Sequence, residues 1–163
     1  MQRSERALDA VPGEDDPVVV RELRPDDLPW VERIDREHSG RARGEYYRLK
    51  LREVQADTGV RISLAALVDG VPAGFVMARV YYGEFGVVEP TALLDSIGVA
   101  GEFGTRGVAA TLVRTLAAHM QALRVDRIET QVSLDQTSLL AFFRHAGFEP
   151  SAKVCLELPV QEP

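Results

Sequence analysis

The sequence has little that would support disulfide, metal or membrane chemistry. It contains a single cysteine, Cys155, which excludes an internal disulfide and lacks the clustered Cys and His partners of a zinc site. No run approaches the ~20 apolar residues of a membrane span, and the N-terminal segment has no apolar signal-peptide core. We therefore expect a cytoplasmic protein without a metal and without a membrane partner.

A basic surface is also missing. The formal net charge is −6 at pH 7, and the only lysines are Lys50 and Lys153. Non-specific binding to nucleic acid depends on Lys and Arg side chains that neutralise phosphates, so a nucleic-acid partner is not expected. A small molecule or a basic peptide fits this charge better.

The length and composition predict one domain with one core. The chain has 163 residues, and 45% of them are hydrophobic. Residues 1–16 are polar and acidic without periodicity, which is typical of a flexible tail. We expect the domain to cover residues 17–163.

Hydrophobic periodicity predicts an α/β fold with a mixed sheet (α+β), in the order β-α-α-β-β-β-α-β-α-β. Asp26 is the expected N-cap of the first helix, and Asp69-Gly70 predicts a tight hairpin. Cys155 is expected to be an ordinary residue of the last strand. Strands are predicted at 18–23, 62–68, 71–81, 91–99, 125–133 and 153–160. Helices are predicted after Asp26, weakly within 36–57, from Val108, and from Asp135 or Gln136.

A glycine-bearing turn joins the strand at 91–99 to the helix that begins at Val108. Such a turn directs backbone N–H groups toward one point, where the helix dipole favours an anion. Gly104 and Gly107 leave room for a diphosphate, and Arg106 can add a charged contact. The same glycines are also compatible with a turn that only shapes the chain. The segment is not a Walker loop and is a poor dinucleotide fingerprint.

This turn resembles the diphosphate motif of the GNAT superfamily of acyl-CoA-dependent N-acyltransferases, over roughly residues 18–160. The family has Gln/Arg-x-x-Gly-x-Gly/Ala after a strand that ends in Val. Here the strand ends in Ile97-Gly98-Val99, and Gly104 stands where the family usually has Gln or Arg. The matching turn is Gly104-Thr105-Arg106-Gly107-Val108-Ala109.

A second GNAT signature is an Asn-led helix that ends in Tyr-x-x-x-Gly-Phe. Residues 136–148 are similar to it, with Gln136 in place of the Asn that reaches the cofactor. Phe143 replaces the Tyr that protonates the departing thiolate in many members. The resemblance implies that acetyl-CoA binds between the strand ending at Val99 and the strand near 128–132, with its pantetheine pairing along the backbone of 97–99.

The resemblance also implies direct attack of an amine on the thioester, which requires a group that accepts the amine proton. Asp95 is the first candidate because the alternation places it on one strand face with Ile97 and Val99; the alternative is that it only bonds its neighbours or a cation. Glu84 and Glu89 in the preceding loop are second choices.

The proton donor is harder to predict, because Phe143 cannot supply a proton. Tyr81 and Tyr82 end the preceding strand and are candidates, although packing of the aromatic rings at a strand end is the preferred interpretation. The three histidines, His38, His119 and His145, are expected to be solvated or to cap helices.

We therefore expect an N-acetyltransferase that acts on a primary amine of a small molecule, peptide or protein, with acetyl-CoA as co-substrate. The alternative is a catalytically impaired acyl-CoA-binding sensor or interaction module of the same fold, which the changes at Gly104 and Phe143 favour. An unrelated nucleotide-binding α/β fold would need a parallel sheet, which the hairpin at Asp69-Gly70 opposes. The family often dimerises, so a homodimer is left open.

Overall fold

The computed structural model describes residues 18–56, 60–83 and 85–160, with the side chains of 52–56 excluded. The described part of the chain divides into two compact units, one up to residue 131 and one from residue 132, and each is described by itself. The predicted tail at 1–16 lies outside the described residues. A single domain over 17–163 stays a prediction.

A five-stranded mixed sheet forms the centre of the first unit, in the order β1-β2-β3-β4-β5. The first four strands are antiparallel neighbours, and β5 joins β4 in parallel. Asp69 and Gly70 both have positive φ, which confirms the predicted tight hairpin between β2 and β3. The strands are β1 (Val18–Glu22), β2 (Arg61–Val68), β3 (Val71–Tyr81), β4 (Thr91–Val99) and β5 (Arg127–Thr130).

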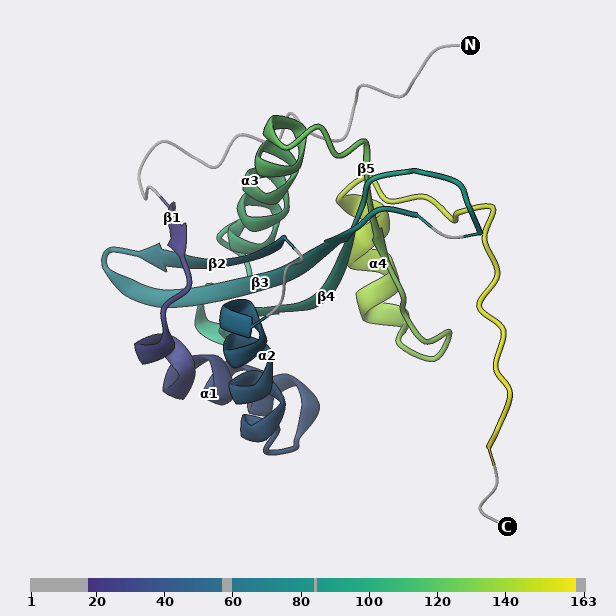
Figure 1. Cartoon of the computed structure of the whole chain (residues 1–163). Coiled ribbons are helices and arrows are strands. Elements are labelled where there is room, and N and C mark those ends of the chain that lie inside the picture. The colour runs from purple at the N-terminus through teal and green to yellow at the C-terminus, as the bar shows by residue number, and fades with distance from the viewer. Residues whose placement is uncertain (1–17, 57–59, 84, 161–163) are drawn as a thin grey trace. The chain divides into compact units, whose positions relative to one another are not determined.

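Helices cover both faces of this sheet. Helices α1 (Leu28–Ser39) and α2 (Gly44–Ala56) lie on one face, and α3 (Val108–Ala122) lies on the other (Figure 1). The weakly predicted second helix is therefore present. The predicted mixed α/β fold and the predicted order of elements are confirmed as far as the fourth helix, α4 (Thr137–His145).

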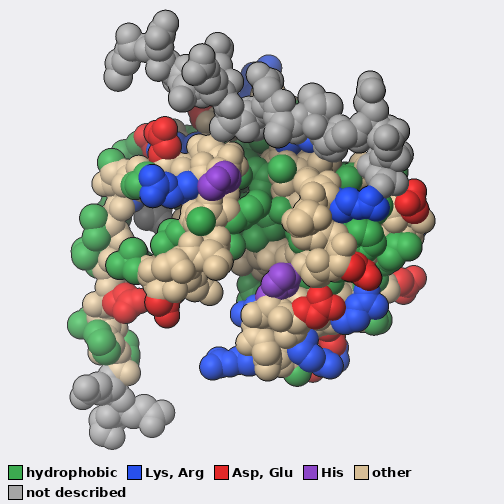
Figure 2. Space-filling view, turned by 180° about the vertical axis from the view of Figure 1, so that it is seen from behind, with side chains coloured by type: hydrophobic (Ala, Val, Ile, Leu, Met, Phe, Trp, Pro, Cys, Tyr) green, Lys and Arg blue, Asp and Glu red, His purple; other side chains and the backbone are tan. Residues whose placement is uncertain are grey.

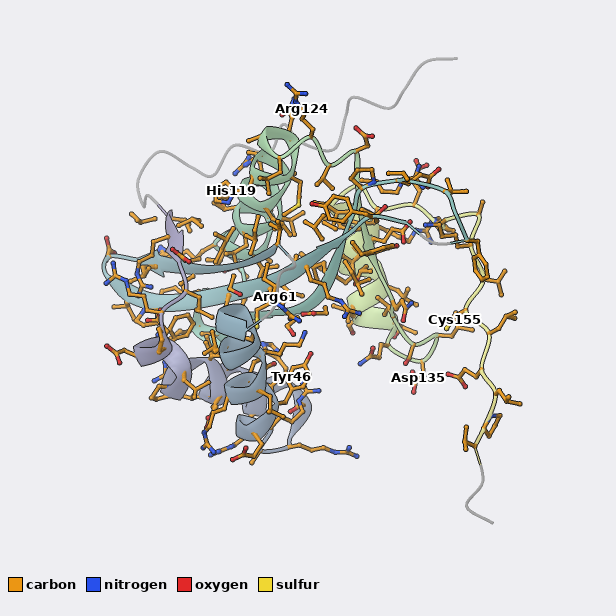
Figure 3. All side chains as sticks on the ribbon, in the orientation of Figure 1. Tyr46, Arg61, His119, Arg124, Asp135 and Cys155 are labelled. Carbon is orange, nitrogen blue, oxygen red and sulfur yellow. The ribbon has the colours of Figure 1, made fainter. Side chains whose placement is uncertain are left out.

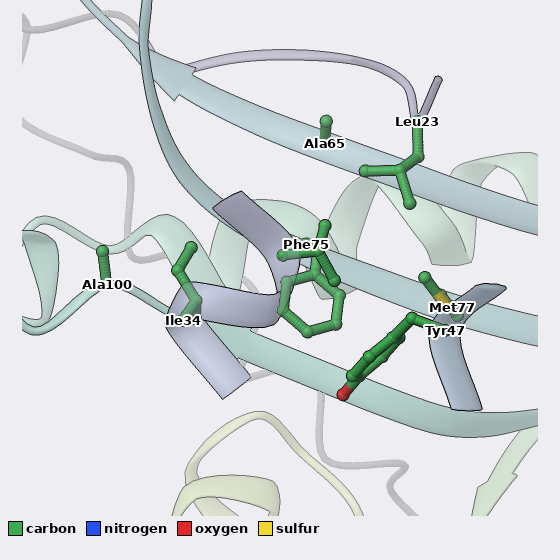
Figure 4. Close-up of a cluster of buried hydrophobic side chains, with 8 residues drawn as sticks. Leu23, Ile34, Tyr47, Ala65, Phe75, Met77 and Ala100 are labelled. Carbon is green, nitrogen blue, oxygen red and sulfur yellow. The ribbon is translucent and has the colours of Figure 1, made fainter. Parts of the chain in front are cut away.

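The core between the sheet and α1/α2 centres on Phe75 of β3. Its ring meets Trp30 and Tyr47 edge-on, with centroids 6.5 and 5.6 Å away. Figure 4 shows Ile34 and Tyr47 on either side of this ring. The other buried members of the cluster are Leu23, Val31, Ala65, Met77 and Ala100.

A buried carboxylate ties α1 to α2. Asp35 accepts hydrogen bonds from Arg43, from the Tyr47 hydroxyl at 2.8 Å and from Ser39 at 3.5 Å. Burial raises the pKa of Asp35, but these donors outweigh it and lower the pKa overall. Burial and the bond to Asp35 both raise the pKa of Tyr47. The phenol therefore remains a proton donor in this network.

The first helix does not begin at the predicted N-cap. Residues 25–27 form a 3-10 turn, and Asp27 rather than Asp26 accepts the Arg24 amide, at 2.7 Å. Asp27 also accepts from Arg21 and from the Trp30 indole. Burial raises the pKa of Asp27, but these hydrogen bonds together lower it to about 2. The predicted cap is wrong because Asp27, not Asp26, is turned inward.

The second unit contains α4 and an extended C-terminal segment. Gly147 has φ 92°, the Phe148 amide donates to the Phe143 carbonyl at 2.9 Å, and the rings of Phe143 and Phe148 are 4.9 Å apart. The predicted glycine cap is thus confirmed.

The strand predicted at 153–160 is wrong. These residues belong to no helix or strand, and Val154, Leu156 and Leu158 are exposed, as is Cys155. The alternating pattern is local, whereas a strand also needs a neighbouring backbone to pair with, and none pairs with these residues among those described.

One face of the molecule carries charged side chains of both signs. On the face shown in Figure 2, Lys and Arg side chains alternate with Asp and Glu, and no large patch of one sign is visible. Among the described residues, none of the helices combines the length and apolar character that a membrane span requires.

Candidate functional site

Strand β4 carries a β-bulge at Asp95. Met77 of β3 pairs with Ser96, and its neighbour Ala78 pairs with Leu94, so Asp95 has no partner on β3. An extra residue in one strand interrupts the two-residue alternation of side chains. The face on which Asp95 lies therefore cannot be read by counting back from the end of β4.

The bulge turns Asp95 toward α2. Its carboxylate forms an ion pair with Lys50 of α2. Val99, in contrast, pairs with Gly74, whose Cβ position is next to α3, so Val99 and Ile97 face α3. The expectation that Asp95 shares a face with Ile97 and Val99 is wrong, because the alternation was counted without the bulge.

Asp95 belongs to a small polar cluster between β4 and α2. Ser96 Oγ donates to Asp95 Oδ1 at 3.2 Å and lies 3.3 Å from the Tyr46 hydroxyl. Lys50 Nζ lies 5.0 Å from the centroid of the Tyr46 ring. Figure 3 shows Tyr46 on α2, on the opposite side of the sheet from His119.

Strands β4 and β5 separate at this bulge. Their parallel pairing runs from Thr91 with Arg127 to Leu94 with Thr130, and the Thr130 hydroxyl donates to the Leu94 carbonyl at 2.9 Å. Among the described residues, no strand pairs with 95–99 on the β5 side. An extended chain containing amides can bind to such an edge as an added strand.

The open edge leads to the first turn of α3. The N-cap, Gly107, has φ 69° and makes no side-chain capping bond, and the first helical bond runs from Thr111 to Gly107. No acceptor among the described residues meets the amides of Gly107, Val108, Ala109 or Ala110. A Cβ at Gly107 would have nothing within 4 Å. These four N–H groups can bind an anion.

The earlier residues of the turn contribute differently. The amide of Gly104 donates to Gly101 at 3.2 Å, and that of Arg106 donates to Phe103 at 3.1 Å. The 3-10 turn at Gly101–Phe103 therefore uses two of the amides expected to bind phosphate. The available amides begin at Gly107, while the side chains of Thr105 and Arg106 are exposed.

The end of β4 is held by α1. His38 Nε2 lies 2.5 Å from the Val99 carbonyl oxygen, and Glu37 accepts the Gly101 amide at 3.3 Å. His38 was expected to be solvated or to cap a helix, and its contact with a strand 61 positions away has no signal in the sequence. His38 therefore already bonds the Val99 carbonyl, one of the backbone groups predicted to pair with pantetheine.

Gly98 allows β4 to pack closely against the core. A Cβ there would lie 2.8 Å from the Phe75 ring and 3.0 Å from Ile34. The residue faces the core, so only its backbone can meet a ligand on the open edge.

Tyr81 lies on the same face as Asp95. Side chains an even number of positions apart in a strand share a face, and Tyr81 is four positions from Met77, which pairs with Ser96. The Tyr81 hydroxyl donates to Glu129 of β5 at 2.9 Å. Sequence reasoning missed Glu129, because its strand was read only through its apolar positions. Glu84 lies outside the described residues.

The remaining candidates are less well placed. Tyr82 is exposed, and Glu89 forms a surface ion pair with Arg127 at 3.4 Å. Gln136 and Phe143 belong to the second unit, where Gln136 is an exposed N-cap and Phe143 is buried beside Phe142 and Phe148. His145 bonds the Ala141 carbonyl within α4. No three metal-binding side chains gather among the described residues.

The chain is similar to a known family in sequence and to solved structures in fold. A sequence model of the Acetyltransferase (GNAT) family matches residues 20–148. No curated protein matches the chain in sequence.

Solved structures share the fold at low identity. An aminoglycoside N-acetyltransferase, AAC(6')-Iy, in complex with CoA is 18% identical, with a TM-score of 0.74 over 91% of this chain and 99% of that one. The aminoglycoside antibiotic 6'-N-acetyltransferase AAC(6')-Ih from Acinetobacter baumannii is 16% identical, with a TM-score of 0.74 over 90% and 100%. A transcriptional regulator from Bacillus halodurans C-125 is 15% identical, with a TM-score of 0.72 over 88% and 100%.

Proposed function

Because the chain belongs to the acetyltransferase (GNAT) family, we propose that it transfers the acetyl group of acetyl-CoA directly to a primary amine of a small molecule, peptide or protein. One observation carries this proposal. The open edge of β4 runs from the unbonded amides at the start of α3 to Asp95, where β4 and β5 separate.

The residues present fit acetyl-CoA, the acyl donor of the family. The amides of Gly107 to Ala110 suit its diphosphate, and the positive end of α3 adds to the attraction. The backbone of 95–99 suits the amide groups of its pantetheine arm. At about 3.3 Å per residue, this edge carries the arm roughly 13 Å from Val99 to Asp95.

Asp95 is the proposed proton acceptor. An ionised carboxylate offers about four acceptor sites, and the described residues fill one on each oxygen, from Lys50 and Ser96. The remaining sites can take an N–H of the acceptor. The amine, once neutral, attacks the thioester carbonyl, and the C–N bond forms as the C–S bond breaks. The nitrogen loses its second proton to water, and CoA leaves as the thiolate.

The acceptor is proposed to be a cationic primary amine. The net charge of −6 favours approach of a cation by long-range steering. Glu129 and Asp95 place two carboxylates on one face of the sheet. Two of the structural relatives are aminoglycoside acetyltransferases, although a relative described as a transcriptional regulator shares the same fold.

Two measurements test the proposal. Thermal shifts with acetyl-CoA, CoA and ATP establish whether the donor binds, and thiol release against a panel of amines establishes transfer. We expect both CoA species to stabilise the protein and at least one amine to release thiol. If acetyl-CoA stabilises the protein but no amine releases thiol, the protein binds the donor without transferring its acetyl group.

That second result would favour the acyl-CoA-binding module. Phe143, which carries no proton to donate, is buried among aromatic rings, and this observation supports such a module. The thermal-shift and thiol-release data together separate the two functions.

A further inference from the structure

Lys50 places a primary amine of the chain directly on the carboxylate proposed to receive the acceptor proton. Nζ of Lys50 pairs with Oδ2 of Asp95, and their side chains are only 16% and 18% exposed. Tyr46, one helical turn earlier on α2, holds the same ammonium group over its ring at 5.0 Å. The amine is thus kept in one place, largely shielded from water.

This arrangement is the one that an acceptor amine needs before it reacts. An ammonium group hydrogen-bonded to a base can pass its proton to that base and become a nucleophile. Asp95 is also the residue at which the open edge of β4 ends. An acetyl group carried along that edge would arrive next to Lys50 as well as next to an external amine.

We propose that Lys50 is a site of self-acetylation, modified on Nζ by acetyl-CoA bound to the same chain. The proposal rests on the proposed function, because it uses the same donor site and the same proton acceptor. Acetylation removes the charge of Lys50 and with it the ion pair to Asp95.

The chemistry balances without any further reactant. The Lys50 ammonium gives one proton to Asp95, and the neutral amine forms a C–N bond with the acetyl carbon. The C–S bond of the thioester breaks, and its electron pair leaves on the CoA thiolate. The amide nitrogen loses its second proton to water, and the thiolate takes a proton from Asp95, which regenerates the carboxylate.

The composition makes this site easy to isolate. Lys50 and Lys153 are the only lysines, and the arginines that supply the remaining basic side chains stay protonated and do not act as nucleophiles. Lys153 is exposed in the C-terminal segment, and Asp95 pairs with Lys50 and not with Lys153, so Lys153 serves as the reference for a lysine without that base. Selective labelling of Lys50 over Lys153 is therefore the signature of a reaction directed by the fold.

The test uses the full chain, acetyl-CoA with an isotopically labelled acetyl group, and peptide mass spectrometry without an added amine. We expect label on Lys50 at a rate at least about 100-fold above that on Lys153, the lower end of what a positioned base contributes. Asp95→Asn is expected to lower the rate at Lys50 by a similar factor. Retention of the thermal shift with acetyl-CoA shows that this variant still folds and binds the donor.

A matched control is available on the same helix. Arg48 lies two positions from Lys50 but faces Glu45 and Glu32, and its side chain is 48% exposed. Arg48→Lys therefore adds a lysine on α2 away from Asp95, and we expect that lysine to be labelled no faster than Lys153.

Three results would overturn the inference: equal labelling of Lys50 and Lys153, labelling of the lysine at position 48 as fast as Lys50, or no label on Lys50 in protein that acetylates an added amine. Failure of the proposed function itself looks different. In that case neither Lys50 nor any added amine takes the label, although acetyl-CoA binds.

Discussion

Helix α2 reaches two carboxylates that differ in how completely the folded chain binds them. Asp35 accepts four hydrogen bonds, two from Arg43 and one each from Tyr47 and Ser39. Asp95 accepts from Lys50 and Ser96 alone among the described residues. A carboxylate has about four acceptor sites, so Asp35 is saturated and Asp95 is not.

The difference separates a structural carboxylate from one that can meet a substrate. The acceptor sites of Asp35 are filled by donors from α1, from α2 and from Arg43 between them, and further binding would require breaking one of these bonds. Asp95 keeps unfilled sites at the point where β4 and β5 separate. Asp35 is also more deeply buried than Asp95, and the number of filled acceptor sites adds a second difference between them.

The largest expected effect comes from removing the charge of Asp95. Asp95→Asn should lower kcat/KM for acetyl transfer by at least about 100-fold, because the amide cannot accept the amine proton. Thiol release at saturating acetyl-CoA measures the change. A variant that transfers acetyl groups at the parent rate over the whole pH range would show that Asp95 is not the base.

The same substitution at Asp35 should act on stability and not on chemistry. Asp35→Asn removes the negative charge that Arg43 and Tyr47 bind, and because the Arg43 side chain is 49% exposed and can be solvated, we expect a loss of about 2 kcal/mol in the free energy of unfolding. Urea unfolding measures this loss, and kcat/KM per folded molecule should stay within a few-fold of the parent. If Asp35→Asn lowered kcat/KM strongly without any loss of stability, Asp35 would not be a purely structural carboxylate.

Asp27 is a second carboxylate whose acceptor sites are all filled, and the pH dependence of stability tests its role. Its pKa is lowered from 3.8 to about 2 in the folded protein, so its contribution is complete above pH 3.8 and is lost as the pH falls through about 2. The shift corresponds to about 2 kcal/mol of stability. Unfolding free energies across this interval should fall less steeply in Asp27→Asn than in the parent, and parallel curves would contradict the assignment.

The smallest expected effect compares two glycines. Gly40, the C-cap of α1, and Gly107 have φ of 66° and 69°, and a Cβ at either would have nothing within 4 Å. Alanine at either position should cost about 1 kcal/mol of stability. Only Gly107→Ala should also weaken acetyl-CoA binding, by about tenfold, because its Cβ would enter the space proposed for the diphosphate. Calorimetric titration of the two variants decides this.

Much of the fold could be predicted from the sequence because its signals are local. The Asp69-Gly70 hairpin, the glycine turn before α3 and the Gly147-Phe148 cap each depend on a few adjacent residues. The strand at 153–160 also had the right local pattern, yet nothing pairs with it among the described residues. Pairing partners are not encoded in a local pattern.

The site was harder to predict, because its geometry depends on one inserted residue. The bulge at Asp95 turns that side chain from the face of Val99 to the face of α2. The alternation of apolar and polar residues in the sequence does not predict this bulge. The contacts of Asp95 with Lys50, and of His38 with Val99, join segments far apart in the sequence. Such pairs become visible only when the strands and helices are assembled.

The separation of β4 from β5 also bears on self-association. Unpaired strand edges invite other chains to add strands and so promote aggregation. The open stretch at 95–99 is short, with a bulge at one end and the 3-10 turn at Gly101–Phe103 at the other. A ligand bound along these five residues would therefore cover the whole open stretch and leave none of it for a second chain.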